Sequence, residues 1–281
     1  MPELPEVETI VRGLRAKIAQ NIIIDSKLFR DECLNKSSLK LETLIGQEII
    51  AVERRGKLIV LKCHAENAPE PTYCIFHLRM TGALLLKDIN QNFNNHTRLA
   101  FLLENQSGQK QTLFFEDIRG FGQAFVAPAS KLNTWSFWQK LGPEPLTLEL
   151  PTFAKILTRF KGKAIKAMLL DQEALAGIGN IYADESLFKA KIHPKRKAGT
   201  LNAKEQEELL AAIKDNLNIS IQNGGTTFRN YQDADGHKGH NQDNLLVYGR
   251  AGQKCPRCGK ILEKLTVAGR GTVICSHCQP E

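Results

Sequence analysis

Four of the seven cysteines have the spacing of a metal site. Cys255-x2-Cys258 and Cys275-x2-Cys278 are separated by sixteen residues, which suits four thiolates closing a tetrahedron around Zn²⁺. With four protein ligands the metal has no open position, so we expect one structural Zn²⁺ here. Two alternatives are disulfides and a finger used only for protein contacts. Positive residues suited to phosphates surround the site and weigh against the second alternative: Lys254, Arg257, Lys260, Lys264 and Arg270.

The amino terminus offers a different chemistry. Removal of the initiator methionine would leave Pro2 with a free secondary amine. An α-amino group titrates near 7.7–8.0 against about 10.4 for lysine, so roughly a tenth of it is unprotonated at pH 7. Its attack on a carbonyl-like carbon gives an iminium, an electron sink for elimination, and Glu3 and Glu6 supply carboxyls that could protonate a leaving oxygen. The alternative is an ordinary helix start.

Composition limits the partners of these groups. The chain has 281 residues, 42% of them hydrophobic, which is enough for one large domain or two ordinary ones and excludes a disordered or fibrous protein. A net charge of +8 favours a polyanionic partner, without separating nucleic acid from a membrane surface. No stretch approaches the roughly 20 uncharged residues of a spanning helix, and the acidic start is no signal peptide. We therefore expect a soluble, cytoplasmic protein with reduced thiols.

The elements that position these groups fall into two halves. Helical spacing of apolar residues predicts a first helix from about Pro5 to Ile18. From about 21 to 127 the chain consists of short segments rich in branched and aromatic residues, without intervening helices, which indicates an antiparallel β-sandwich. After Pro151 the pattern becomes helical, and the longest helix begins at Asn202 and stops at Gly224-Gly225. The fold class is thus α+β.

The domain boundaries follow from these changes of pattern. We expect a β-sandwich domain over 1–130, a linker over 131–150, a helical domain over 151–243 and the zinc module over 244–281. Two strand-like stretches of that module flank Gly269-Arg270-Gly271, which predicts a β-hairpin with Arg270 at its tip.

Several motifs, in the same order along the chain, resemble those of formamidopyrimidine-DNA glycosylases. The resemblance runs from residue 2 to residue 278 and is carried by Met1-Pro2-Glu3-Leu4-Pro5-Glu6-Val7-Glu8-Thr9, Arg54-Arg55-Gly56-Lys57, His77-Leu78-Arg79-Met80-Thr81-Gly82, Gly177-Ile178-Gly179-Asn180-Ile181-Tyr182 and the four terminal cysteines. The leucine at position 4 is more similar to this family than to the related endonuclease VIII, which typically has glycine at this position. The resemblance implies a bifunctional glycosylase and abasic-site lyase that removes oxidised purines such as 8-oxoguanine and formamidopyrimidines, then cuts the strand by β,δ-elimination.

The resemblance also implies the roles of the reacting residues. Pro2 would attack the deoxyribose C1′ to form a Schiff base, with Glu3 as proton donor and Glu6 supporting them. Lys57 matches the lysine assigned to proton donation in β-elimination. Arg270 matches the finger arginine associated with δ-elimination.

A base cannot be attacked at its sugar while it is stacked, so the duplex must be opened and the gap filled. Met80, Arg119 and Phe121 match the family's trio for this task. By hydrophobicity alone Met80 and Phe121 would be core residues, but their glycine neighbours Gly82, Gly120 and Gly122 suggest exposed turns.

Other residues match positions that contact the DNA backbone. These are His96, Lys161, Lys166 and Asn180, the last in a segment that resembles the tight link of a helix-two-turn-helix motif. The segment after Gly224-Gly225 resembles the loop that folds over the everted base. His240-Asn241 departs from the aromatic pair of some relatives at this place, a difference that bears on the lesion preference.

These inferences define the expected partners. The ligand is damaged double-stranded DNA, with no membrane and no small-molecule cofactor, and the absence of a sustained heptad or apolar stripe favours a monomer. Two other functions stay open: a glycosylase of the same fold that prefers oxidised pyrimidines, and a non-catalytic zinc-ribbon protein that binds DNA or RNA.

Overall fold

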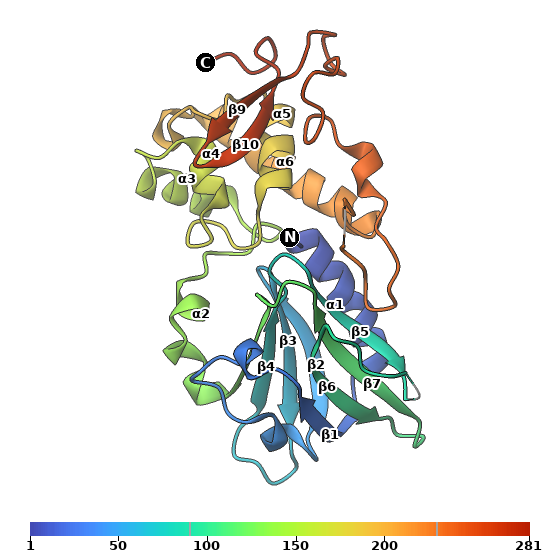
Figure 1. The fold of residues 1–281 in the computed structure, drawn as a ribbon. Helices are drawn as coiled ribbons and strands as arrows, with labels where there is room; N and C mark the ends of the chain where they lie inside the picture. Colours follow the sequence, from blue (N-terminus) through green and yellow to red (C-terminus); the bar gives the residue numbers. More distant parts are fainter. Residues whose placement is uncertain (90, 229) are drawn as a thin grey trace. The chain divides into compact units, whose positions relative to one another are not determined.

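The chain divides into two compact units. The computed structural model describes residues 1–89, 91–228 and 230–281 (Figure 1). The first unit comprises Met1–Gln139 and Asn223–His240, and the second comprises Lys140–Gln222 and Asn241–Glu281. Among the described residues no helix has the length and apolar content needed to cross a bilayer.

The first unit begins with helix α1 (Leu4–Ile18), as the apolar spacing predicted. Glu3 and Glu6 form a capping box that satisfies two backbone N–H groups at its start, and Pro5 lies in its first turn. Its buried face includes Val7 and Leu14, which have no exposed surface.

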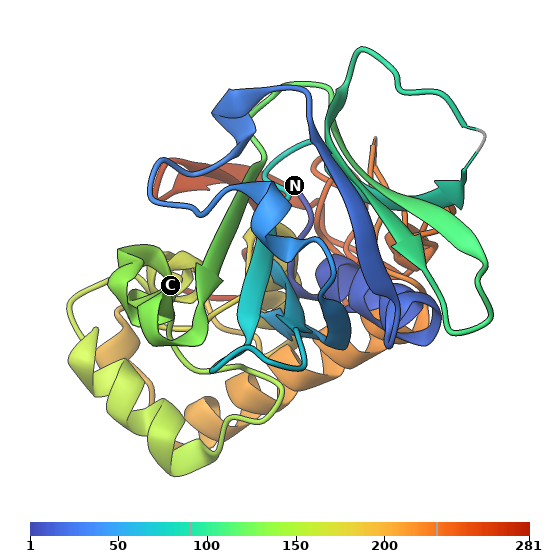
Figure 2. The same ribbon diagram turned by 90° about the horizontal axis from the view of Figure 1, so that it is seen from below.

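Eight antiparallel strands follow α1. They are β1 (Ile22–Leu28), β2 (Glu48–Arg55), β3 (Leu58–His64), β4 (Thr72–His77), β5 (Gly82–Asp88), β6 (Thr97–Glu104), β7 (Lys110–Asp117) and β8 (Gln123–Pro128). Their order is β5-β7-β6-β1-β2-β3-β4-β8. The short helices of this part of the chain are η1 (Asp31–Cys33), η2 (Leu41–Leu44), η3 (Ala129–Thr134) and α2 (Ser136–Lys140). Figure 2 shows the strands and α1 from a second direction.

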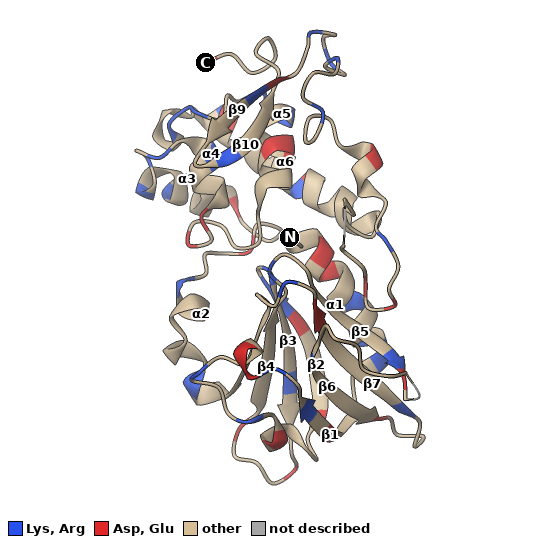
Figure 3. Cartoon of the chain, viewed as in Figure 1, with Lys and Arg blue, Asp and Glu red and all other residues tan. Residues whose placement is uncertain are grey.

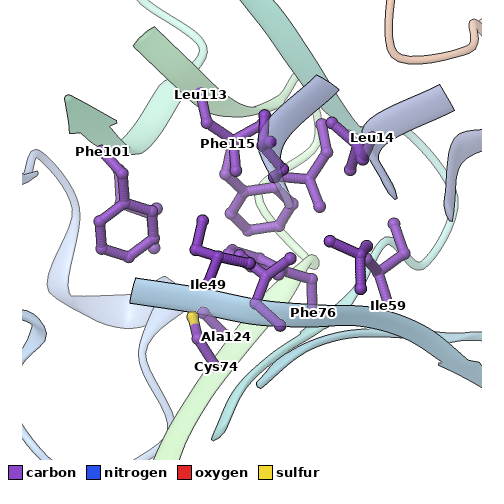
Figure 4. Close-up of a cluster of buried hydrophobic side chains, with 14 of the residues drawn as sticks. Leu14, Ile49, Ile59, Cys74, Phe76, Phe101, Leu113, Phe115 and Ala124 are labelled. Carbon is purple, nitrogen blue, oxygen red and sulfur yellow. The ribbon is translucent and has the colours of Figure 1, made fainter. Parts of the chain in front are cut away.

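The eight strands form the two layers of a sandwich. At the middle of the ladder, β1 and β2 share only the pair Ile22↔Glu48, whereas the other neighbouring strands pair over six or more positions. The ladder therefore folds at this joint. Phe76 of β4 and Phe115 of β7, which are not neighbours in the ladder, meet edge to face with ring centroids 5.4 Å apart (Figure 4). The predicted antiparallel sandwich is confirmed.

The second unit is mostly helical, as predicted. Its elements are α3 (Leu150–Arg159), α4 (Ile165–Leu170), α5 (Asn180–Lys189), η4 (Ala198–Thr200), α6 (Ala203–Gln222), η5 (Asn241–Asn244), β9 (Glu263–Val267) and β10 (Arg270–Ile274). Asn202 and Glu205 cap α6 reciprocally at 2.9 and 3.0 Å, and Gly224, with φ of 70°, follows the end of the helix.

The carboxy-terminal hairpin forms, with its turn one position earlier than expected. Strands β9 and β10 pair from Arg270↔Val267 to Ile274↔Glu263. Ala268 and Gly269 make the turn with φ of 52° and 69°, as a two-residue turn of this hand requires. Arg270 is consequently the first residue of β10 and not the tip of the hairpin.

The segment 223–240 belongs to the first unit, although it follows α6 directly. The Thr226 N–H donates to the Glu6 carboxylate at 2.8 Å, and the Leu86 N–H donates to the Ala234 carbonyl at 3.0 Å. Tyr231 and Ala234 join the sandwich core. We predicted one helical domain over 151–243, which includes this segment. Contacts between residues far apart in the chain leave no local pattern from which the different boundary could be predicted.

Candidate active site and nucleic-acid interface

The amino terminus lies in a buried polar setting on the first unit. Pro2 is buried, Glu3, Glu6 and Lys57 are each less than 8% exposed, and Met1 is 48% exposed. Burial lowers the pKa of the terminal amine below its ordinary value of 8.0 and the Lys57 charge lowers it further, while Glu3 and Glu6 act in the opposite direction. Removal of Met1 would transfer the free amine to the buried Pro2. The structure thus brings together four residues that the sequence singled out.

Glu6 uses both carboxylate oxygens to hold this terminus. Oε2 accepts the Glu3 N–H at 2.8 Å and Oε1 accepts the Thr226 N–H at 2.8 Å. The Tyr231 hydroxyl lies 3.0 Å from the Gly224 carbonyl and 3.3 Å from the Glu6 carbonyl. This geometry makes Glu6 a support that joins the start of α1 to the segment 223–240.

Lys57 is positioned by the turn between β2 and β3. Gly56 has φ of 57°, a conformation that glycine adopts readily. The Arg54 guanidinium binds the Gly56 carbonyl at 3.1 Å and the Glu8 carboxylate of α1 at 2.8 Å. Burial of Glu8 opposes its ionisation, but hydrogen bonds from Arg54 and Arg12 outweigh burial and lower its pKa. A partly buried ion pair therefore ties α1 to the turn that carries Lys57.

Met80 and Phe121 lie on the surface, as the neighbouring glycines suggested, and not in the core. They are 46% and 58% exposed, and the Arg119 guanidinium lies 5.1 Å from the Phe121 ring centroid. Ile118, which the sequence analysis did not single out, is 55% exposed in the same loop. This part of the first unit therefore presents apolar side chains and a cation to solvent.

Two buried residues beside these loops were also missed. Asp117 is 1% exposed and binds groups of both loops. His77 is 7% exposed, and its Nδ1 accepts the Arg79 N–H at 3.0 Å. Burial, assisted by Arg79 and Lys57, lowers the pKa of His77 to about 3. His77 opens one of the motifs that carry the family resemblance, and Asp117 lies two residues before Arg119, but neither signal shows that these side chains are buried and bind the loops.

In the second unit some of the residues predicted to contact DNA are exposed and one is buried. Lys161 and Arg270 are exposed, and the Asn180 amide at the start of α5 donates to the Gly271 carbonyl at 2.9 Å. Lys166, by contrast, has no exposed surface. The expectation that Lys166 faces the DNA backbone is corrected by the structure.

Lys166 is an internal cation. Its Nζ lies 2.6 Å from an Asp184 carboxylate oxygen of α5 and donates to the Thr272 hydroxyl at 2.7 Å and the Gly271 carbonyl at 3.2 Å. Burial raises the pKa of Asp184 to about 6, although the Lys166 ammonium acts against this change. Asp184 also accepts the Val273 N–H at 3.2 Å. Lys166 and Asp184 thus fix β10, and with it Arg270, against α4 and α5.

The four predicted cysteine ligands converge. Their sulfur atoms all lie within 4.8 Å of one another, with Cys255 to Cys278 at 4.0 Å and Cys258 to Cys275 at 3.4 Å. A tetrahedron with Zn–S bonds of about 2.3 Å has edges of about 3.8 Å, so the thiols fit a zinc ion. Although burial opposes ionisation of Cys255, N–H groups of Arg257 and Cys258 outweigh it and lower the pKa of this thiol to about 7.

Family models match nearly the whole chain. The formamidopyrimidine-DNA glycosylase N-terminal domain matches residues 1–124, the formamidopyrimidine-DNA glycosylase H2TH domain matches 141–232, and a zinc finger found in FPG and IleRS matches 252–280.

Individual relatives are similar over their full length. The formamidopyrimidine-DNA glycosylases of Desulforamulus reducens and Herpetosiphon aurantiacus are 38% and 41% identical, with at least 99% of each chain covered. Among solved structures, MutM (Fpg) from Thermus thermophilus is 36% identical with a TM-score of 0.86, covering 100% of this chain and 99% of that one. A Lactococcus lactis Fpg mutant in complex with DNA containing Fapy-dG is 33% identical with a TM-score of 0.87, and both chains are covered completely.

Proposed function

Because the chain belongs to the formamidopyrimidine-DNA glycosylase family, we propose that it excises oxidised purines from double-stranded DNA in base-excision repair and then cuts the abasic strand. Solved relatives hold DNA with Fapy-dG, an abasic site or carbocyclic 8-oxo-G. The observation that carries the proposal is the start of the chain, where the buried Pro2 lies with the buried Glu3, Glu6 and Lys57. The pKa of the Met1 amine at this place is lowered by burial.

The proposed reaction uses the processed terminus as nucleophile. The Pro2 nitrogen forms a bond to C1′ as the bond from C1′ to the base breaks. The base leaves with the electron pair and takes up the proton that the nitrogen releases. Protonation of the ring oxygen by Glu3 opens the sugar and yields the iminium. Loss of a C2′ proton then expels the 3′ phosphate, with Lys57 as proton donor in this elimination. Arg270 is assigned to the following δ-elimination, which releases the 5′ phosphate.

The exposed residues have matching roles on the DNA. Met80 and Phe121 would fill the space left by the everted base, while Arg119 would bind the orphaned base. His96, Lys161 and Asn180 would contact phosphates, the last at the first turn of α5. The zinc ion supplies only structure, because four thiolates leave it no open position. We also propose a cytoplasmic location, in keeping with the bacterial relatives.

Borohydride trapping tests the proposed chemistry. Reduction of the iminium should link the wild-type protein covalently to a duplex containing 8-oxoguanine. Pro2→Gly should lower the rate of trapping by at least about 100-fold, equivalent to about 2.7 kcal/mol of transition-state free energy. Pro5→Ala, a control in the same helix start, should trap normally.

The controls separate the possible failures. Intact mass must first establish that Met1 is absent from the protein used. A protein with a free Pro2 that gives no adduct on 8-oxoguanine but does on dihydrothymine is a glycosylase for oxidised pyrimidines. A protein that binds both duplexes and traps with neither is a non-catalytic DNA-binding protein, and the proposal is then wrong.

A further inference from the structure

We propose that Asp117 is a positioning residue that holds three segments together so that they can open the duplex: the Met80 turn, the His96 segment and the Arg119–Phe121 loop. This inference rests on the proposed function, because it assigns a cause to the arrangement of residues that would meet the DNA. Asp117 ends β7 and is 1% exposed, so its carboxylate lies under the loops and not on their surface.

The first set of contacts reaches the turn that carries Met80. The Thr81 hydroxyl, one residue after Met80, donates to Asp117 Oδ1. Gly82 packs so closely that a Cβ there would lie 2.5 Å from the Leu78 carbonyl oxygen. Since this turn is tight and Thr81 is bound at its centre, the position of Met80 depends on the carboxylate.

The second set reaches the loop that carries Arg119 and Phe121. The Gly122 N–H donates to Asp117 Oδ2 at 2.6 Å. The Arg119 N–H lies 3.2 Å from Asp117 Oδ1 and 3.1 Å from the Thr81 hydroxyl. One carboxylate thus binds both ends of the loop, and the Thr81 hydroxyl bridges the two loops directly.

The backbone of Asp117 adds a third connection. Its N–H donates to the His96 carbonyl at 2.9 Å, and its own carbonyl accepts the Arg98 Nε–H at 3.0 Å and a second Arg98 N–H. The loop is also closed sterically, because a Cβ on Gly122 would lie 2.6 Å from the Phe115 ring. The three segments assigned to DNA contact on this unit therefore share one buried residue.

Both carboxylate oxygens of Asp117 accept hydrogen bonds from the loops. An amide in place of the carboxylate would present N–H groups on one side, where it would face a backbone N–H as a second donor. Asp117→Asn should therefore loosen one loop while it preserves the volume of the side chain. Misplacement of a positioning group by about 1 Å lowers a rate by up to about 100-fold.

The experiment compares a substrate that must be opened with one that is already open. Excision of 8-oxoguanine from a duplex by Asp117→Asn should be at least about tenfold slower at saturating DNA. Borohydride trapping on a single-stranded abasic oligonucleotide, which needs no base eversion, should stay within about twofold of wild type. Glu116→Gln is the matched control, because it removes the neighbouring carboxylate, which pairs only with Lys87 at 2.7 Å among the contacts described.

Two further variants keep the test decisive if Asp117→Asn does not fold. Thr81→Val removes the bridging hydroxyl and should reproduce the duplex-specific defect, whereas Thr81→Ser should restore the wild-type rate. Where Asp117→Asn does fold, Arg119→Ala should slow it by less than it slows wild type, because both changes act on the same group of loops.

The outcomes are distinct. A wild-type protein inactive on both substrates refutes the proposed function. If wild type is active and both Asp117→Asn and Thr81→Val open and process the duplex at the wild-type rate, the role of Asp117 is refuted. Equal losses on duplex and single strand would also overturn it, because Asp117 would then serve the fold in general.

Discussion

Burial determines what the individual site residues can do. His77, Glu6 and Asp117 are all polar and nearly inaccessible. His77 and Asp117 each bind a backbone N–H group of a loop that carries predicted site residues, and Glu6 binds the N–H group of the predicted site residue Glu3. A buried polar group without such a partner would cost about 1–3 kcal/mol. The same hydrogen bonds that satisfy these residues therefore set the positions of the exposed or reactive residues beside them.

His77 should make the stability of the first unit depend on pH. Its pKa is about 3 in the folded protein against about 6.5 unfolded, so between these values the unfolded chain binds a proton that the folded chain excludes. Stability is full above pH 6.5 and falls as the pH drops, by up to about 1.4 kcal/mol per unit. His77→Asn, which keeps an acceptor for the Arg79 N–H, should flatten this slope between pH 6 and 4.

Urea unfolding followed by tryptophan fluorescence would measure this slope, because both tryptophans, Trp135 and Trp138, belong to the first unit. His96→Asn changes an exposed histidine of the same unit and should leave the slope as in wild type. Parallel pH profiles for His77→Asn and wild type would contradict the assigned cause.

At the scale of elements, the second unit places its predicted DNA-contacting residues through internal charges. The Lys166–Asp184 pair connects α4 to α5, and both residues bind the backbone or side chains of β10. Glu185 accepts three N–H groups from residues 246–248, at the start of the zinc module. Figure 3 marks all Lys and Arg alike, yet a buried lysine such as Lys166 holds elements together and an exposed one is available to a ligand.

The salt dependence of DNA binding should separate these two kinds of lysine. Each phosphate contact contributes about −0.9 to the slope of log K against log salt, so Lys161→Met should reduce the slope by about one. Lys166→Met combined with Asp184→Asn should leave the slope unchanged, because no exposed charge is removed. We pair the two changes since loss of Lys166 alone would leave a buried carboxylate, at a cost of about 3–5 kcal/mol.

Titration of a labelled duplex at several salt concentrations gives both slopes. Lys204→Met, which alters an exposed lysine of α6 that pairs at 3.8 Å with Glu208, controls for the loss of a distant charge. A slope that falls as much in the Lys166 variant as in Lys161→Met would restore the original assignment of Lys166 as a phosphate contact.

The whole molecule combines two separately packed units. The sandwich core and the cluster that surrounds the zinc ligands, which includes Phe188, Val247 and Leu262, share no residues. The proposed nucleophile belongs to the first unit and Arg270 to the second. Loss of one core should therefore leave the other folded.

Removal of zinc tests this independence. Cys258→Ala should release the metal and weaken DNA binding by about tenfold or more, because the hairpin that carries Arg270 loses its anchor. The unfolding curve of the first unit, read from tryptophan fluorescence, should stay within about 0.5 kcal/mol of wild type. Zinc content and duplex affinity are measured on the same samples.

Cys63→Ala is the control for loss of a buried thiol, since Cys63 lies in the sandwich core. It should retain zinc and destabilise the first unit instead. Full DNA affinity in zinc-free Cys258→Ala would show that the finger does not support binding.

Local patterns in the sequence determined most of the elements and the zinc ligands. Apolar periodicity placed α1 and α6, strand-like runs indicated the sandwich, and two Cys-x2-Cys pairs identified the four sulfur atoms, because these features depend on residues close together in the chain. The family of the chain could be inferred in the same way from short motifs.

Only the tertiary structure decided which polar residues are buried and what they bind. Lys166 is buried and pairs with Asp184, and Asp117 binds groups of two loops. The segment 223–240 belongs to the first unit. Each outcome depends on partners distant in the chain, 36 residues for Asp117 and Thr81 and 220 for Glu6 and Thr226. The local sequence around a lysine or aspartate does not reveal whether its side chain is buried or exposed in the folded protein. Burial therefore has to be taken from the tertiary structure.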